Sequence, residues 1–309
     1  MSSLDFLLWL DQIRSPILND VMIGLSALGS EEAYTIILTT IYLCIGHRFG
    51  FHLFVMFLGG AYANGVLKEA FGTLRPFEMY PEQLNPLYPG SAAGDAFPSG
   101  HAQNAATVWG IIAIRQKSPL WRRLILLLIL GIGFSRLYCS VHWPADVLGG
   151  FGFGGLLVAV YLFLMGAWQT TGRRLEMLNG AIIVVAASVL MFMAAGEIEV
   201  CADSAGAILG AGLGYILLEA RGGYNAKAPR LTQVLKIVIA LAVLLGMRAG
   251  VKDLLGESPG ADYARYALIG FTCAYLLPAF FTGYYNWRMR AKKAMEMLEE
   301  ENAKEEQDG

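Results

Sequence analysis

Long apolar stretches separated by short polar connections make up most of the sequence. A helix rises about 1.5 Å per residue, so about 20 largely apolar residues cross the hydrocarbon core of a bilayer. Several stretches are shorter, and their ends are fixed only to within a few residues. The pattern predicts an all-α integral membrane protein, a helical bundle with about nine transmembrane helices. The predicted spans are residues 32–46, 50–71, 100–115, 123–139, 145–167, 179–196, 203–220, 232–249 and 262–284.

Residues 4–29 have a different pattern, which predicts one or two amphipathic helices broken at Ser15-Pro16 because proline cannot continue a helix. Charged side chains interrupt every apolar run of this segment, so we expect neither a secretory signal nor a span. The segment is typical of a helix that lies on the membrane surface. The interrupting residues are Asp5, Asp11 and Arg14.

Lysines and arginines in the connections predict the orientation, because they favour the cytoplasmic side. Alternate connections form two sets, of which one is basic and the other mostly acidic. The basic set holds Arg48, Arg115, Lys117, Arg122, Arg123, Arg173, Arg174, Arg221, Lys227, Arg230, Arg288, Arg290, Lys292 and Lys293, and the other holds Glu197, Glu199, Asp203, Lys252, Asp253, Glu257 and Asp262. We expect the basic set in the cytoplasm, with the N-terminus outside and the C-terminus inside.

The composition agrees with a membrane protein, since 56% of the residues are hydrophobic and only 16% are charged, against about 25% charged in globular domains. A net charge of −2 and the lack of a basic aromatic patch argue against nucleic-acid binding. The four cysteines are scattered without zinc-site spacing, and a disulfide between Cys139 and Cys201 stays open. Glycines repeated at Gly206, Gly210 and Gly214 favour close helix packing.

The unusual polar residues fall at the outer ends of four predicted spans, where ionisable groups are costly unless they are paired or functional. Lys68 and Arg75 are seven residues apart, about two helical turns, so they can face one anion. Arginine presents a planar fork to phosphate oxygens, and lysine a point charge. The further members are Pro98, Ser99, Gly100, His101, Ser135, Arg136, His142 and Asp146.

A helix that begins near Ser99 would aim free backbone N–H groups at a phosphate, and Gly100 would let the backbone come close. His142 and Asp146 are four residues apart and share a helix face. The carboxylate can then take the Nδ1–H and leave Nε2 ready to attack. Because the sequence has no acidic cluster suited to Mg²⁺, we expect a metal-free reaction through a phosphohistidine, with no cofactor.

Each residue also has a structural interpretation. Lys68 or Arg75 alone can snorkel to the interface, and a lone histidine such as His101 is more often a satisfied core residue. Ser135 can bond its own helix backbone. Tyr138 and Trp143 are predicted to be interfacial aromatics.

Together, Lys68, Arg75 and Pro76, then Pro98-Ser99-Gly100-His101, then Ser135-Arg136 with His142 and Asp146 resemble the three signature motifs of the type 2 phosphatidic acid phosphatase superfamily. The resemblance covers residues 60–165. It implies that His142 is the nucleophile, that Asp146 orients it, and that His101 protonates the leaving oxygen. It also implies that the phosphoryl group is bound by Lys68, Arg75, Ser99, Gly100 and Arg136.

The resemblance implies a phosphatase that hydrolyses a lipid phosphate or diphosphate at the extracytoplasmic face of a bacterial cytoplasmic membrane. The substrates implied are phosphatidate, phosphatidylglycerophosphate, undecaprenyl diphosphate and sphingoid phosphates. The loop 77–97 is predicted to be a lid or selector, and its acidic residues Glu78, Glu82 and Asp95 favour a monophosphate. Alternatives are a phosphatase of a soluble ester, similar to glucose-6-phosphatase, and a non-enzymatic transporter or binder of phosphate lipids.

We expect four parts along the chain. These are an amphipathic interfacial segment (1–30), a phosphatase core bundle (31–168), additional transmembrane helices (169–285) and a charged cytoplasmic tail (286–309). The expected partners are the lipid phosphate substrate and membrane lipids, and the sequence leaves a homo-oligomer open.

Overall fold

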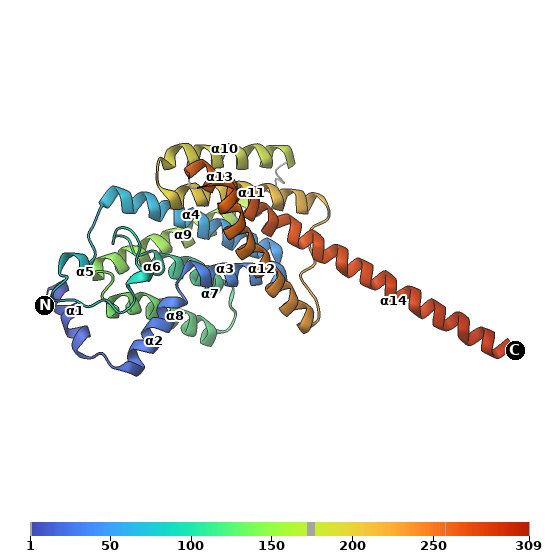
Figure 1. Ribbon diagram of the computed structural model, residues 1–309, viewed down its shortest axis with the longest axis horizontal. Helices are drawn as coiled ribbons and strands as arrows, with labels where there is room; N and C mark the ends of the chain where they lie inside the picture. The colour runs from blue at the N-terminus through green and yellow to red at the C-terminus, as the bar shows by residue number, and fades with distance from the viewer. Residues whose placement is uncertain (1, 172–176, 257, 309) are drawn as a thin grey trace.

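The structure is a computed structural model that describes residues 2–171, 177–256 and 258–308. These residues form helices and connections and contain no β-strand, as predicted for an all-α protein (Figure 1). The helices are α1 (Ser3–Gln12), α2 (Pro16–Ala27), α3 (Glu31–Thr40), η1 (Ile41–Ile45), α4 (His47–Phe71), α5 (Pro76–Met79), η2 (Pro89–Ser91), α6 (Gly100–Asn104), η3 (Ala105–Trp109), α7 (Gly110–Arg115), α8 (Pro119–Tyr138), α9 (Pro144–Thr171), α10 (Met177–Ala195), α11 (Glu199–Ala220), α12 (Arg230–Leu255), α13 (Pro259–Phe271), η4 (Thr272–Leu276) and α14 (Leu277–Asp308).

Helices occupy all nine stretches predicted to span the membrane, but they are not equally suited to crossing it. Among the described residues, six helical segments are long and apolar enough, and a seventh results if α2 and α3–η1, bent by 56°, count as one span. The stretch 100–115 is short, and α8 carries three arginines, so neither is among the six. An integral membrane protein is confirmed, while the count of nine crossings stays a prediction.

The N-terminal segment forms two helices, α1 and α2, with the break at the predicted position. Ser15 caps α2 by accepting a hydrogen bond from the backbone N–H of Leu18, and Pro16 takes the first helical position. Leu7 and Leu10 of α1 are fully buried against Leu84 of the loop 77–97. Helix α1 therefore packs on the loop that precedes α6, whereas α2 packs on α8.

The glycines of α11 serve close packing, as predicted. A Cβ atom on Gly210 would lie 1.8 Å from the carbonyl oxygen of Ala267 in α13, and one on Gly206 would lie 2.1 Å from that of Tyr263. Backbones in such contact exclude any larger side chain. The C-terminal helices thus form a tight unit, which packs on α4 through α11.

Helix α4 connects the two ends of the bundle. At its start, Arg48 pairs with Glu219 at the end of α11 (2.7 Å). Near its end, Gly65 lies against Val200 in the first turn of α11. With 25 residues, α4 is roughly 37 Å long. The start of α4 and the end of α11 therefore lie at one end of the bundle, and Lys68 lies at the other.

All four cysteines are free, including Cys139 and Cys201, so the disulfide left open by the sequence is not formed. Two of the basic residues used to predict the orientation, Arg173 and Arg174, lie outside the described residues, as does Glu257.

Candidate active site

The predicted site residues come from six segments that meet at one end of the bundle. Lys68 lies in the last turn of α4, which Gly72 ends in the left-handed conformation (φ 53°). Arg75 and Ser99 are the N-cap residues of α5 and α6. Gly100 and His101 follow in α6, Arg136 lies in the last turn of α8, His142 in the α8–α9 turn and Asp146 in the first turn of α9.

His142 is held between Asp146 and Arg75. Its Nδ1 lies 3.3 Å from Asp146 Oδ2, and its Nε2 lies 3.2 Å from Arg75 Nη1. The same carboxylate oxygen accepts the backbone N–H of Trp143 at 2.7 Å, so Asp146 also caps the start of α9. These partners assign the proton of a neutral ring to Nδ1 and the lone pair to Nε2.

The Arg75 side chain is buried and fully bonded, mostly to backbone oxygens. Nε donates to the carbonyl of Gly94 (2.8 Å), and Nη2 donates to those of Ala93 (2.7 Å) and Asp95 (3.2 Å). Nη1 donates to the carbonyl of Val141 at 2.9 Å beside its contact with His142. The end of the loop 77–97 and the turn before His142 therefore both hold this guanidinium.

The other two cations are bound in the same way. Lys68 donates to the carbonyl of Asp95. Arg136, which is fully buried, donates to the hydroxyl of Ser26 in α2, to the hydroxyl of Ser91 (2.9 Å) and to the Ser91 carbonyl (3.1 Å). All three cations thus contact neutral oxygen atoms.

The start of α6 offers polar groups that are not yet bonded. The Ser99 hydroxyl, His101 Nε2 and Arg136 Nε are buried and have no hydrogen-bond partner among the described residues. A buried polar atom in this state costs about 1–3 kcal/mol. A phosphoryl group, which brings acceptor oxygens, can satisfy the hydroxyl, the imidazole N–H and the guanidinium together.

Hydrogen bonds of Asn64 and Gln103 hold the turn before α6 against α4. Asn64 donates to the carbonyl of Pro98 (3.2 Å) and to Gln103 Oε1 (3.0 Å), and Gln103 donates to the carbonyl of Gly60 (2.7 Å). A Cβ atom on Gly100 would lie 3.3 Å from Asn64 Oδ1. A larger residue at position 100 would therefore press on the Asn64 side chain, so glycine favours the close approach of this turn to α4.

The pKa of His142 lies well below its usual value near 6.5, first because the ring is buried and second because Arg75, Arg136 and Lys68 repel a proton. The imidazole is therefore neutral at physiological pH, with a lone pair available for attack.

Four residues near the site were not predicted from the sequence. Asn64 could have been found, because an amide inside an apolar helix signals an interhelical contact. Ser26, Ser91 and Gln103 carry no such signal. For Ser135 the structural interpretation holds, since its hydroxyl donates to the carbonyl of Ile132 at 2.6 Å.

The prediction of an interfacial aromatic is wrong for Tyr138. Its ring is fully buried, and its hydroxyl donates to Asn19 Oδ1 of α2 at 2.8 Å. The aromatic ring faces protein because α2 packs on α8 at this level. Trp143 donates from Nε1 to the carbonyl of Leu74 at 3.1 Å.

Comparison with known proteins identifies the family of the chain. The family model described as "PAP2 superfamily" matches residues 49–171, and a second one, described as "PAP2 superfamily phosphatase, transmembrane extension", matches residues 202–286. The phosphatidylglycerophosphatase B of Bacillus subtilis is 33% identical over 162 residues, which are 47% of this chain and 74% of that protein. An undecaprenyl-diphosphatase of Sulfolobus acidocaldarius is 32% identical over 157 residues, 49% of this chain and 66% of that protein.

Among solved structures, a PAP2 type phosphatidylglycerolphosphate phosphatase from Bacillus subtilis is 27% identical with a TM-score of 0.45, covering 56% of this chain and 87% of that one. The chain belongs to the PAP2 superfamily. It is an all-helical membrane phosphatase whose last helices match the transmembrane extension known in that superfamily.

Proposed function

We propose that the chain hydrolyses a lipid phosphate or lipid diphosphate at the extracytoplasmic face through a phosphohistidine intermediate, without a metal ion. The observation that carries this proposal is the position of His142, whose two ring nitrogens face Asp146 at 3.3 Å and Arg75 at 3.2 Å. A neutral imidazole with Nε2 among cations is prepared to attack an anion at phosphorus.

In the first step, Nε2 of His142 attacks the phosphorus atom in line with the leaving oxygen. The P–N bond forms, the P–O ester bond breaks, and His101, as an imidazolium, gives a proton to the leaving oxygen and becomes neutral. Asp146 keeps the Nδ1–H and stabilises the positive charge that develops on the imidazole. Arg75 and Arg136 neutralise the equatorial oxygens.

In the second step, a water molecule attacks the phosphohistidine. His101 takes a proton from this water, the P–N bond breaks, and inorganic phosphate is released with His142 again neutral. The two steps place opposite demands on one residue, since His101 acts first as acid and then as base. Its Nε2, which is buried and bonded to no described residue, is available to the leaving oxygen and to the water molecule, and this supports the role.

Binding of the phosphoryl group requires the cations to exchange partners. Lys68 and Arg75 both donate to the carbonyl of Asp95, and Arg75 also to those of Ala93 and Gly94. A phosphate dianion is a stronger acceptor than a carbonyl, because charged hydrogen bonds are roughly twice as strong as neutral ones. We therefore assign to residues 93–95 the role of a lid that the substrate displaces.

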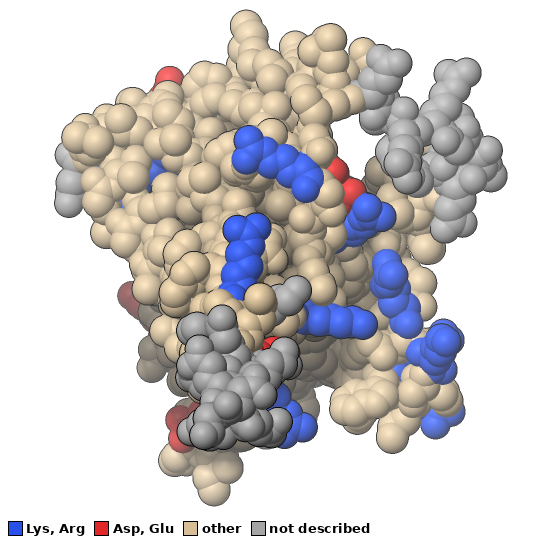
Figure 2. All heavy atoms as spheres, turned by 90° about the vertical axis from the view of Figure 1, so that its right-hand side faces the viewer, with Lys and Arg blue, Asp and Glu red and all other residues tan. Residues whose placement is uncertain are grey.

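The distribution of charge supports an extracytoplasmic site. Figure 2 shows lysines and arginines gathered at the end of the molecule from which α14 projects. Arg48, Arg115 and Arg221 are exposed on helices that start or finish at this end. The site lies at the other end of α4, and basic residues favour the cytoplasm.

A lipid substrate is supported by the relatives, which include a phosphatidylglycerophosphatase, an undecaprenyl-diphosphatase and a lipid A 1-phosphatase. Helices of membrane-spanning length around the site would let an apolar tail stay in the bilayer. We keep the division into an interfacial segment (1–30), a core bundle (31–168), additional helices (169–285) and a tail (286–309) as part of the proposal.

The test is phosphate release by purified protein in detergent, with EDTA present. The panel contains phosphatidate, phosphatidylglycerophosphate, undecaprenyl diphosphate, a sphingoid phosphate and glucose 6-phosphate. We expect release from at least one lipid, inhibition by vanadate, which mimics five-coordinate phosphorus, and a rapid-quench signal from phosphohistidine. Loss of release with EDTA contradicts the metal-free reaction, and activity on glucose 6-phosphate alone favours the soluble-ester alternative.

His142→Ala should abolish turnover, with His52→Ala as a matched control. His52 lies in the part of α4 near the opposite end of the bundle and contacts none of the cations of the site. If His142→Ala still binds or transports phosphate lipids although it releases no phosphate, the chain is a transporter or binder of phosphate lipids.

A further inference from the structure

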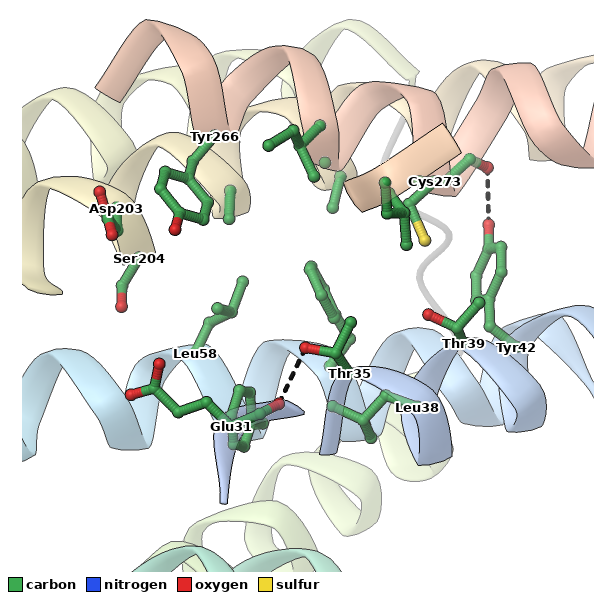
Figure 3. A pocket seen from close by; sticks show the side chains of 18 of the residues that line it. Glu31, Thr35, Leu38, Thr39, Tyr42, Leu58, Asp203, Ser204, Tyr266 and Cys273 are labelled. Carbon is green, nitrogen blue, oxygen red and sulfur yellow. Dashed lines mark hydrogen bonds between the residues drawn. The ribbon is translucent and has the colours of Figure 1, made fainter. Parts of the chain in front are cut away.

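A cavity of about 370 Å³ lies between the core helices α3 and α4 and the C-terminal helices α11, α12 and α13 (Figure 3). Its walls are mostly apolar, and they include Leu38, Phe54, Leu58, Leu244 and Ile269. The volume is within the range of small-molecule sites, about 300–1,000 Å³. A cavity with such walls suits a hydrocarbon chain.

The depth of the cavity matches one leaflet of a bilayer. Glu31 and Tyr42 both line it and are eleven residues apart on α3 and η1, which corresponds to roughly 16 Å of helix. Half of the roughly 30 Å hydrocarbon core is about the same length. Ile36 and Leu245, which line the cavity from α3 and α12, are 45% and 66% exposed. The cavity is therefore open to the side of the bundle, where lipid lies.

Charged groups gather at one end of this cavity. Figure 3 shows Glu31 and Asp203 at the end opposite Tyr42 and Cys273. Glu32 and Arg248 also line the cavity. Asp203 Oδ1 is buried without a hydrogen-bond partner in the described chain.

The charged groups at this end of the cavity are three carboxylates and one guanidinium. Within the described ranges, none of these carboxylates forms an ion pair with Arg248. The charged end therefore offers carboxylates to a cation and one guanidinium to an anion.

This charged end and the active site lie at the same end of the bundle but do not merge. Gly29, two residues before Glu31, packs against His101, with a Cβ position 3.1 Å from the imidazole. Between the cavity and Lys68, Gly65 of α4 is covered by Val200 of α11, with a Cβ position 2.5 Å from that side chain. The active site offers three cations to a phosphate dianion, whereas the carboxylates at this end of the cavity repel a dianion.

We propose that the cavity binds one acyl chain of a phospholipid with an amine-bearing, zwitterionic headgroup. The ammonium group meets the carboxylates of Glu31, Glu32 and Asp203, and the lipid phosphate meets Arg248. A single lipid then bridges α3 to α11, α12 and α13. This assigns to the C-terminal helices the binding of an accessory lipid that is not the substrate, and the assignment is independent of the proposed reaction.

The test measures lipid retained by delipidated protein in detergent, by native mass spectrometry, with dioleoyl phosphatidylethanolamine and dioleoyl phosphatidylglycerol. We expect one phosphatidylethanolamine per chain, bound at least tenfold more tightly than phosphatidylglycerol. Glycerophosphoethanolamine, which lacks the chains, should not bind. Tighter binding of the anionic lipid, or equal binding of both, overturns the proposal.

Two variants locate the site. Leu244→Trp fills the cavity from a position that is 8% exposed and should abolish retention, whereas Val238→Trp, 57% exposed on the same helix, should not. Equal retention by both variants overturns the location. The double variant Glu31→Gln, Asp203→Asn leaves Glu32 alone to balance Arg248 and should remove the preference for phosphatidylethanolamine over phosphatidylglycerol; an unchanged preference overturns the headgroup assignment.

The unfolding temperature of each variant serves as the folding control. If Leu244→Trp does not fold, the double variant alone decides. Phosphate release should continue in every folded variant, so failure of the lipid test and failure of the proposed reaction give different results.

Discussion

Replacement of Arg14 by alanine tests whether the N-terminal helices take part in catalysis. Arg14 lies between α1 and α2, and its guanidinium donates to the carbonyls of Asn85 (2.6 Å) and Tyr138 (2.8 Å) and to the hydroxyl of Ser140 (2.9 Å). It thereby joins the N-terminal segment, the loop 77–97 and the α8–α9 turn. His142 follows two residues after Ser140, so the turn that Arg14 holds is the one that carries the nucleophile.

The magnitude follows from the two bonds to the turn. A hydrogen bond to a charged group contributes about 1.5–3 kcal/mol, and the Tyr138 carbonyl and Ser140 hydroxyl both lose one. Ser140 also has a positive φ of 56°, which costs a residue with a side chain about 1–2 kcal/mol. Without Arg14 the turn can relax toward an unstrained φ, and a shift of about 1 Å at His142 lowers the rate roughly 100-fold.

The assay is steady-state phosphate release together with thermal unfolding. We expect Arg14→Ala to lower kcat by roughly 30- to 100-fold with KM within a few-fold of wild type, because the phosphate cations are untouched. Arg122→Ala is the matched control, since Arg122 is exposed and donates only to the carbonyl of Gln116. Ser140→Gly removes the strain, so its combination with Arg14→Ala should lose less activity than the sum of the single effects. A lower unfolding temperature with kcat unchanged would refute the reasoning.

Three further changes test other parts of the site. Asn64→Leu removes two buried hydrogen bonds beneath the turn before His101, and should lower the free energy of unfolding by about 2–4 kcal/mol in denaturant titrations. Ser26→Ala leaves a buried Arg136 donor misplaced and should raise KM about fivefold with a smaller change in kcat, measured by initial rates. The low pKa of His142 means that, as pH falls below about 6.5, the unfolded chain binds a proton that the folded chain refuses. Wild type should therefore lose more unfolding free energy than His142→Gln between about pH 7 and pH 5.5.

The residues of the site could be predicted from the sequence because their side chains carry the chemistry. Spacing placed His142 and Asp146 on one helix face, and the structure has their ring nitrogen and carboxylate oxygen 3.3 Å apart. The partners of Arg75 could not be predicted in this way, because four of its bonds end on backbone carbonyls. Every residue has a backbone carbonyl group, so residue types do not indicate which carbonyls point toward Arg75.

The same limit applies to the fold. Hydropathy located a helix in each of the nine predicted stretches, but not the short helices α5 and η2 in the predicted loop. The three arginines of α8 interrupt its apolar run, so this helix is not among those apolar enough to span a membrane. Tyr138 was assigned to the membrane interface from its type and its place at a helix end. The packing of α2 on α8, a contact between segments more than a hundred residues apart, buries it instead.

The way in which the phosphate cations are held has a consequence for turnover. In the described chain, Lys68, Arg75 and Arg136 form no ion pair with a carboxylate, although both arginines are buried and Lys68 is half-buried. A carboxylate partner would fix each cation but would compete with the phosphate, and breaking a buried ion pair costs about 3–5 kcal/mol. A neutral hydrogen bond contributes only about 0.5–1.5 kcal/mol net. Carbonyl and hydroxyl partners therefore orient the cations while leaving most of their attraction for an incoming dianion, and they can bind again when phosphate leaves.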